Sequence, residues 1–177
     1  MTDALRYPAG CFAEPAGPLT PDEIAAAITE IEALPAALRS ATENLSGDVL
    51  ETPYRPGGWT VRQTVHHVAD SHTNAVVRFK WALTEEAPAI KVYDEAAWAG
   101  LPDTRAPVAL SLDLLGALHA RWVVLLRGLG PDEWARTFVH PDDGPTRLDR
   151  TAAMYAWHGR HHLAHVGLVT GRPGRAG

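Results

Sequence analysis

Residues 57–86 read GGWTVRQTVHHVADSHTNAVVRFKWALTEE, and their pattern predicts one long amphipathic helix. Gly57 and Gly58 break the chain before it. Thr60 and Gln63 form a capping box, in which each side chain bonds the backbone N–H of the other residue. Apolar residues then recur at helical spacing along one face: Val61, Val65, Val68, Val76, Phe79 and Leu83. We expect a helix of about 24 residues, about 36 Å long.

The segment 20–45, nearer the start of the chain, carries the same kinds of helix signal. Thr20 is the expected N-cap, Pro21 takes the first helical position, and Glu23 closes a second capping box. Isoleucines and leucines follow at helical spacing. We expect Pro35 to kink or split this helix, because proline has no N–H to continue the hydrogen-bond ladder.

Two later segments complete the set. Residues 111–130 carry one apolar face, made by Leu112, Leu115, Leu118, Trp122, Leu125 and Leu129. The segment 149–171 is expected to begin with Asp149 as N-cap and to stop at Gly171. The connection 86–110 is long enough to line a site or to carry short helical turns of its own. No alternating strand pattern competes, so we expect an all-α four-helix bundle, with residues 1–177 as a single domain.

Composition narrows the classes of function. The chain has 177 residues and a formal net charge of −5, and its sequence pI is about 6.0. Nucleic-acid-binding proteins usually show clustered Lys and Arg, so we expect no nucleic-acid partner. The single cysteine, Cys11, and the lack of a signal-peptide pattern indicate a cytoplasmic protein. No stretch approaches 18 uninterrupted apolar residues, so we expect no membrane partner.

Histidines gather in residues 155–166, which read YAWHGRHHLAHV. On a helix they form two i, i+4 pairs, His158/His162 and His161/His165, and residues at this spacing share one side of the helix. Neutral histidine is the commonest metal ligand in proteins, so either pair could chelate a metal. Periodicity favours the first pair only slightly, because this helix is apolar nearly all round.

A polar stripe runs along the helix predicted over residues 61–84, opposite its valines. It consists of Gln63, His67, Ser71, Asn74 and Arg78. Short, mostly uncharged hydrogen-bonding groups suit the wall of a semi-enclosed polar cavity better than a solvated face.

The other histidines of this helix point elsewhere. His72 falls on the apolar face, where we expect a hydrogen-bonded core histidine. His66 is expected to pair with Asp70 at i+4.

Several blocks together resemble the YfiT branch of the DinB-like superfamily. They are YPAG near the start, residues 52–98, LHARWVVLL, HPDDG and YAWHGRHHLAHV. The resemblance implies a four-helix bundle, commonly a homodimer, that holds one divalent metal per chain on three histidines. By motif these positions are His67, His158 and His162. His161 and His165 then become neighbours of the ligands or core groups, and Asp70 and His140 are further candidates for the surroundings of the metal.

Three neutral imidazoles leave the charge of a Zn²⁺ or Ni²⁺ ion uncompensated and leave a coordination position open. The resemblance implies two activities on a small-molecule substrate: a metal-dependent hydrolase that activates water, or an S-transferase that activates a low-molecular-weight thiol of the bacillithiol or mycothiol type. A hydrolase usually needs a carboxylate base, as in H-E-x-x-H enzymes. Here Gly159, Arg160 and His161 lie between the two ligands, which favours thiol transfer.

Further candidates would bind the substrate or cosubstrate. Arg78 and Arg121 are the cations that could hold the carboxylates of such a thiol, and Asn74 lies on the same stripe as His67 and Arg78. A non-catalytic metal sensor is a third alternative. The sequence leaves open whether the loop 86–110 covers the site or packs a dimer.

Overall fold

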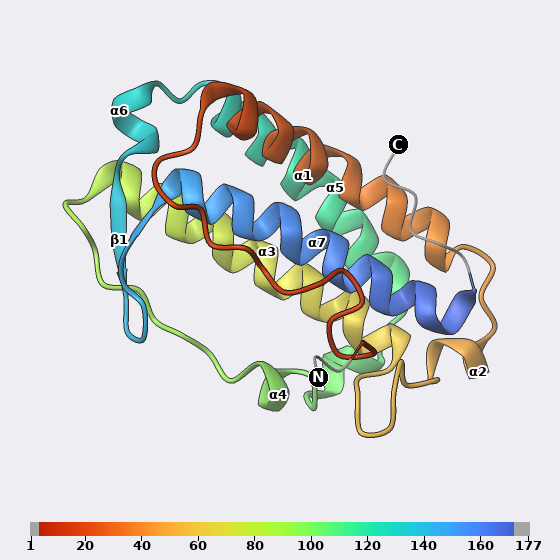
Figure 1. Cartoon of the computed structure of the whole chain (residues 1–177). Coiled ribbons are helices and arrows are strands. Elements are labelled where there is room, and N and C mark those ends of the chain that lie inside the picture. The colour runs from red at the N-terminus through yellow and green to blue at the C-terminus, as the bar shows by residue number, and fades with distance from the viewer. Residues whose placement is uncertain (1–3, 172–177) are drawn as a thin grey trace.

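The computed structural model describes residues 4–171, and four long helices form its bundle (Figure 1). These are α1 (Pro21–Thr42), α3 (Val61–Thr84), α5 (Val108–Arg127) and α7 (Leu148–Thr170). Helices α1 and α3 each pack against both α5 and α7. Short helical turns connect them: α2 (Gly47–Leu50), α4 (Glu95–Trp98), the 3₁₀ turn η1 (Pro102–Arg105) and α6 (Pro131–Trp134). The predicted four-helix bundle is therefore confirmed.

The two predicted capping boxes are present. Thr20 and Glu23 cap α1, and Thr60 and Gln63 cap α3, with side-chain and backbone bonds in both directions. Pro35 was expected to kink or split the first helix; a split is wrong, because α1 continues through Pro35, and a kink stays a prediction. Proline removes only one bond of the ladder, the one that its N–H would make to the carbonyl of residue 31.

The start of α7 also differs from the sequence prediction. Its N-cap is Arg147, and Asp149 lies inside the first turn. The Asp149 carboxylate is nevertheless occupied with backbone groups, since it accepts from Arg150 N at 2.7 Å and from Leu19 N at 3.2 Å. The helix begins earlier than expected because the preceding residues are held in a strand that runs directly into it.

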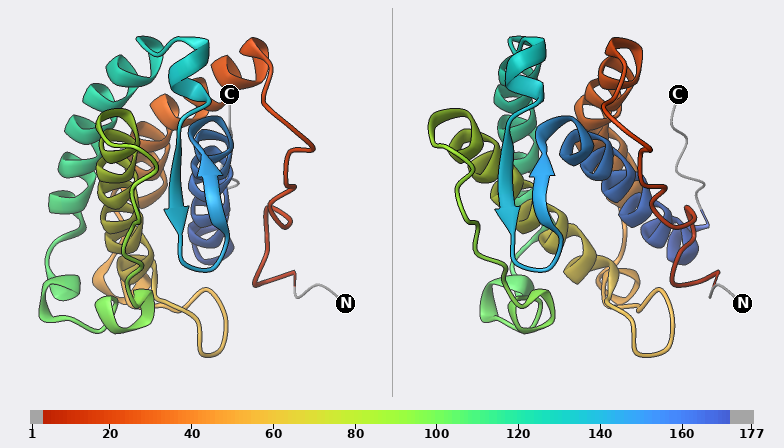
Figure 2. Two further views of the ribbon diagram at one scale, coloured as in Figure 1. Left: turned by 90° about the vertical axis from the view of Figure 1, so that its left-hand side faces the viewer. Right: turned by 60° about the vertical axis from the view of Figure 1, so that its left-hand side comes forward.

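That strand belongs to a hairpin that the all-α prediction missed. Strands β1 (Thr137–His140) and β2 (Gly144–Arg147) pair antiparallel, with Thr137 opposite Arg147 (Figure 2). Each strand has four residues, TFVH and GPTR, which is too short to show alternation. Ile90 N donates to Val139 O at 3.0 Å, so the hairpin also anchors the connection between α3 and α5.

The segment before α1 runs along α7 (Figure 1). Trp157 Nε1 donates to Gly10 O at 3.1 Å, and the Arg150 guanidinium donates to the Glu14 carboxylate at 2.5–2.6 Å. This segment brings Arg6 and Tyr7 to the same end of α7 as its histidines.

Helix α5 is the one helix of the described residues that is long and apolar enough to cross a membrane by length and composition. Its best window has a mean hydropathy of 1.5, and 28% of that window is buried. In the bundle it packs on α1 and α3, and its outer side exposes Leu110, Leu114 and Val124 beside the charged Asp113 and Arg121. The homodimer and the absence of a membrane partner both stay predictions.

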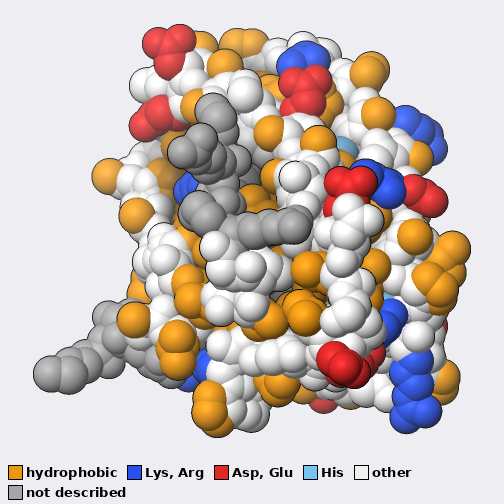
Figure 3. All heavy atoms as spheres, turned by 90° about the vertical axis from the view of Figure 1, so that its right-hand side faces the viewer, with side chains coloured by type: hydrophobic (Ala, Val, Ile, Leu, Met, Phe, Trp, Pro, Cys, Tyr) orange, Lys and Arg blue, Asp and Glu red, His pale blue; other side chains and the backbone are white. Residues whose placement is uncertain are grey.

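Figure 3 shows one further face, where acidic and basic side chains lie interspersed among hydrophobic ones. In places on this face, acidic and basic side chains lie next to one another, and no large basic patch is seen there. The absence of a nucleic-acid partner stays a prediction.

Candidate metal centre

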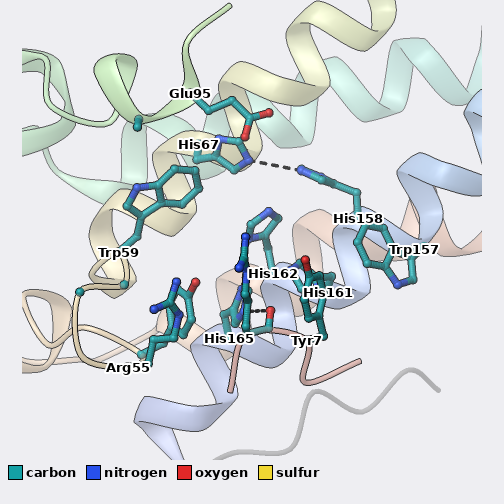
Figure 4. Close-up of a pocket in the computed structure, with 15 residues that line it drawn as sticks. Tyr7, Arg55, Trp59, His67, Glu95, Trp157, His158, His161, His162 and His165 are labelled. Carbon is teal, nitrogen blue, oxygen red and sulfur yellow. Dashed lines mark hydrogen bonds between the residues drawn. The ribbon is translucent and has the colours of Figure 1, made fainter. Parts of the chain in front are cut away.

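Three histidines from two packed helices meet near one end of the bundle. His67 enters from α3, and His158 and His162 enter from successive turns of α7 (Figure 4). One ring nitrogen from each lies within 4.8 Å of the others, and His67 Nε2 is 3.3 Å from His158 Nε2. The structure thus brings together the three residues that the family resemblance implies.

The separation of the two Nε2 atoms fits a shared metal. Nitrogen ligands about 2.0–2.1 Å from a tetrahedral metal are about 3.3–3.4 Å apart. His67 and His162 are both buried, at 5% and 7% exposure, and His158 is only slightly more open. Imidazole donors with an incomplete shell of three suit Zn²⁺, Ni²⁺ and other divalent transition metals.

The histidines are neutral, as a metal requires. Burial lowers the pKa of His67 to about 4, with a smaller contribution from His161. Burial first, and then repulsion from neighbouring histidines, lowers the pKa of His158 and His162 well below the ordinary value. Protons therefore do not compete with a metal for these nitrogens near pH 7.

The cluster opens into a cavity of about 490 Å³. Its walls come from the N-terminal segment, the turn before α3, α4 and α7. The lining residues are Arg6, Tyr7, Tyr54, Arg55, Gly57, Gly58, Trp59, His67, Glu95, Ala96, Trp157, His158, His161, His162 and His165. The volume lies within the range of sites for small molecules.

Aromatic rings hold the histidines in place around this cavity. Trp59 lies against His67 with ring centroids 4.5 Å apart, and Tyr54 stacks on His165 at 3.8 Å. Trp157 stacks on His161 at 4.7 Å. The rings of His67, His161 and His165 therefore have little freedom to turn away from the cavity.

Glu95 is a carboxylate of this cavity that the sequence prediction missed. It is the first residue of α4, and its carboxylate points into the cavity near His67 (Figure 4). Burial raises its pKa, whereas the nearby Arg78 lowers it. The connection 86–110 was expected to line a site or form short turns, and it does both. Its acidic pair Asp94–Glu95 was the available signal.

His161 and Arg78 lie where a supporting role is possible. His161 lines the cavity beside Trp157 and Tyr7. Arg78 contacts the Tyr155 hydroxyl at 3.4 Å and Lys91 O at 3.5 Å, and it influences Glu95 electrostatically without lining the cavity itself.

Four other candidates lie outside the cavity. Asn74 donates to the Asp70 carbonyl within α3, and the pKa of the Asp70 carboxyl is raised by burial and by Asp103 of η1. Arg121 is exposed on the outer side of α5. His140 is on the hairpin, 3.7 Å from an Asp143 carboxylate oxygen. Of the predicted polar stripe, His67 lines the cavity and the other four residues do not, because the connection between α3 and α5 covers much of the stripe, as the bond from Gln63 Nε2 to Ala99 O shows.

The two remaining histidines of α3, His66 and His72, do not line the cavity. His72 is a fully buried, hydrogen-bonded histidine, as predicted. The predicted pairing of His66 with Asp70 is wrong, because His66 bonds Ser111 Oγ at 2.7 Å and Ala106 O at 3.1 Å across to the start of α5.

Comparison with known proteins gives consistent results. The model of the DinB superfamily matches residues 30–166. A protein of Bacillus cereus, named a putative metal-dependent hydrolase, is 53% identical over 162 residues, 92% of this chain and 93% of that protein. One of Bacillus mycoides with the same kind of name is 52% identical over the same shares.

Two solved structures are also similar. YfiT from Bacillus subtilis, described as a probable metal-dependent hydrolase with an unusual four-helix bundle topology, has a TM-score of 0.92 at 44% identity, covering 96% of this chain and 97% of that chain. TT2238, a four-helix bundle protein, has a TM-score of 0.54 at 23% identity, covering 79% and 94%, and shares the fold alone. The resemblance to YfiT drawn from the sequence is confirmed.

Proposed function

The chain belongs to the DinB superfamily, and we propose that it is a divalent-metal-dependent hydrolase whose metal is held by His67, His158 and His162. The observation that carries this proposal is that the three histidines and a carboxylate, Glu95, line one cavity. A metal held there would supply Lewis acidity, lowering the pKa of a bound water and polarising a carbonyl. The relatives named as metal-dependent hydrolases support the same class of reaction.

Glu95 takes the part of the proton acceptor. A general base works best when its pKa lies near the working pH, and burial moves the pKa of Glu95 upward in that direction. The neighbouring Asp94 also raises this pKa, whereas Arg78 lowers it. The proposed base thus comes from α4, in the connection between α3 and α5, and not from the residues between His158 and His162.

The mouth of the cavity favours an anionic substrate. Arg6 and Arg55 line it, each with its guanidinium 5.5–5.6 Å from the ring of the adjacent tyrosine. Arg55 Nε is a buried donor without a hydrogen-bond partner among the described residues. A carboxylate or phosphate on a small molecule would pair with the guanidinium groups of Arg6 and Arg55 while the reacting group reaches the histidines.

Thiol S-transfer is the second candidate. The absence of a glutamate between His158 and His162 no longer favours it, because Glu95 supplies a carboxylate from elsewhere. The cationic mouth favours it, since Arg6 and Arg55 suit a low-molecular-weight thiol with carboxylates, of the bacillithiol or mycothiol type. This reaction also needs no proton acceptor from the protein.

Two assays on protein loaded with Zn²⁺ or Ni²⁺ separate the candidates. One follows p-nitrophenyl esters without added thiol, and the other follows conjugation of bacillithiol or mycothiol to a bromobimane. Metal-dependent ester turnover that falls in Glu95→Gln supports the hydrolase. Conjugation without ester turnover supports the transferase. Tight metal binding with neither activity would leave a metal sensor and overturn both enzymatic proposals.

A further inference from the structure

A backbone carbonyl in α1 lacks its usual partner and bonds a histidine instead. In an α-helix the N–H of residue 35 would bond the carbonyl of residue 31, but Pro35 has no N–H. His119 of α5 fills the gap, with Nδ1 2.6 Å from Ile31 O. A carbonyl only accepts hydrogen bonds, so His119 Nδ1 carries the hydrogen.

From this carbonyl a chain of imidazoles leads to the candidate metal centre. A neutral imidazole has one N–H, so His119 Nε2 is an acceptor, 2.9 Å from His72 Nδ1. His72 then donates from Nδ1 and accepts at Nε2, which is 3.2 Å from His158 Nδ1. His158 donates in turn, which leaves the lone pair of its Nε2 facing His67.

The neutral state of these rings is secured by their surroundings. His72 and His119 are 0% and 1% exposed. Their ring nitrogens bond only each other, His158 and the Ile31 carbonyl, and a buried imidazole without a carboxylate partner is neutral. Each ring therefore holds one hydrogen, and the direction of every bond in the chain follows from its end at Ile31.

A second, shorter chain of hydrogen bonds leads from a backbone carbonyl to His162. His165 Nε2 lies 3.2 Å from Arg6 O in the N-terminal segment, so it donates there. His165 Nδ1 is then an acceptor, 3.4 Å from His162 Nδ1. His162 donates from Nδ1 and keeps the lone pair of Nε2. This contact is longer than those of the first chain, and the Tyr54 ring stacked on His165 holds it in place.

We propose that His72, His119 and His165 are positioning residues, which use the carbonyls of Ile31 and Arg6 to fix the tautomers of His158 and His162 so that both present Nε2 to a metal. The opposite tautomer of the first chain would aim an unprotonated His119 Nδ1 at the Ile31 carbonyl, lone pair against lone pair. This proposal rests on the metal centre of the proposed function. It also gives a role to His165, a histidine of the α7 cluster that is not among the three proposed ligands.

The test compares two replacements of His119. In His119→Gln the amide N–H can donate to Ile31 O, and the amide oxygen can accept from His72, so the direction of the chain is kept. In His119→Phe both partners lose their bond. His66→Phe is the matched control, because His66 is another buried histidine that bonds a neighbouring helix but lies off the chain.

Two readouts are measured. Long-range ¹H–¹⁵N spectra of the metal-free protein report which nitrogen of each histidine is protonated, and Zn²⁺ titration gives affinity at a temperature where every variant is folded by circular dichroism. We expect His158 to be protonated on Nδ1 alone in wild type, His119→Gln and His66→Phe. In His119→Phe we expect mixed tautomers and affinity lower by about 10-fold to 100-fold.

Either of two results overturns the proposal: His158 protonated on Nε2 in the metal-free wild type, or His119→Phe with unchanged tautomer and affinity. A purely structural role for His119 would lower stability and leave both readouts unmoved. Failure of the proposed function can be told apart from failure of this proposal. If ester turnover is absent, tautomer and affinity still decide the positioning role, whereas a wild type that binds no Zn²⁺ would overturn the metal centre and this proposal together.

Discussion

His67 of α3 and His158 of α7 are 91 residues apart in the chain, and their Nε2 atoms lie 3.3 Å apart in the fold. Without a metal, two neutral nitrogens at this distance gain at most one hydrogen bond, whereas a divalent metal binds both. We expect about one Zn²⁺ or Ni²⁺ per chain in the wild type and affinity lower by more than about 100-fold in His67→Ala and His158→Ala. Elemental analysis and titration of untagged protein measure this.

His140→Ala is the control for that experiment, because His140 is on β1 and does not line the cavity. It should bind metal as the wild type does. A folded wild type that stays metal-free after Zn²⁺ and Ni²⁺ are supplied would contradict the three-histidine centre and leave these residues as packing groups.

Replacing Glu95 distinguishes a role in proton transfer from a role in metal binding. Glu95→Gln keeps the shape of the side chain and removes the proton acceptor, so we expect kcat to fall by about 10²-fold to 10⁴-fold with metal affinity unchanged. Because the base acts when ionised and its pKa is raised, the rate should increase with pH through that pKa, and this limb should vanish in the variant. Stopped assays across pH measure both.

Glu86→Gln is the matched change in the same connection, since Glu86 is exposed and outside the cavity. It should leave kcat and the pH profile as they are. An active Glu95→Gln enzyme with the wild-type profile would show that the proton goes elsewhere.

The sequence predicted the helices because their signals are local. Thr60 with Gln63, and the valines of α3, decide a helix within a few residues, and the structure has that helix at Val61–Thr84. The hairpin was missed because four-residue strands such as GPTR are stabilised by contacts made elsewhere in the chain. Ile90, for example, bonds Val139, which is distant in the sequence.

The residues of the candidate site also fall into those that the sequence predicted and those that it did not. The helical spacing of His158 and His162 and the stripe position of His67 were visible in the sequence. Glu95 was not, because its place in the cavity depends on how a connection without periodicity folds back over α3. The role of Pro35 was missed for a related reason: its lost N–H matters only because His119 of another helix meets Ile31 O.

Arg55 should decide how well anionic substrates bind. Charged hydrogen bonds contribute about 1.5–3 kcal/mol, so Arg55→Gln should raise KM about 10-fold to 100-fold for a p-nitrophenyl ester with a free carboxylate. KM for neutral p-nitrophenyl acetate should not change. Arg121→Gln is the control, because Arg121 is exposed on the outer side of α5. Equal effects of Arg55→Gln on both esters would count against an anionic substrate.

The buried histidines should make the metal-free protein sensitive to acid. Burial lowers the pKa of His119 and of His161 to about 4, below the 6.5 expected when unfolded, so the unfolded chain binds more protons between these values. The free energy of unfolding should therefore decrease as pH falls from about 6.5 toward 4, by at most about 1.4 kcal/mol per pH unit for each such histidine. The raised pKa values of Asp70 and Glu95 act in the opposite direction but belong to less buried groups.

Urea unfolding at several pH values measures this dependence. His119→Gln should have a shallower slope than the wild type, since one titrating group is gone. A free energy of unfolding that is constant between about pH 6.5 and pH 4.5 would mean that these histidines are protonated in the folded protein.

Gly159, next to His158, allows α1 to approach α7 closely. A Cβ atom added there would lie 2.7 Å from Leu34 Cδ2, and Leu34 is only 5% exposed, so it has little room to move. Overpacking of this kind costs about 1–3 kcal/mol, and alanine returns about 0.5–1 kcal/mol by favouring the helix, so we expect Gly159→Ala to lower the free energy of unfolding by up to about 2 kcal/mol. Gly116 of α5 is the matched control, because an added Cβ there meets no atom within 4 Å. Alanine at that position favours the helix by about 0.5–1 kcal/mol, so urea unfolding should show the two variants moving in opposite directions. If Gly159→Ala were as stable as Gly116→Ala, the close contact between α1 and α7 beside the histidines would not exist in solution.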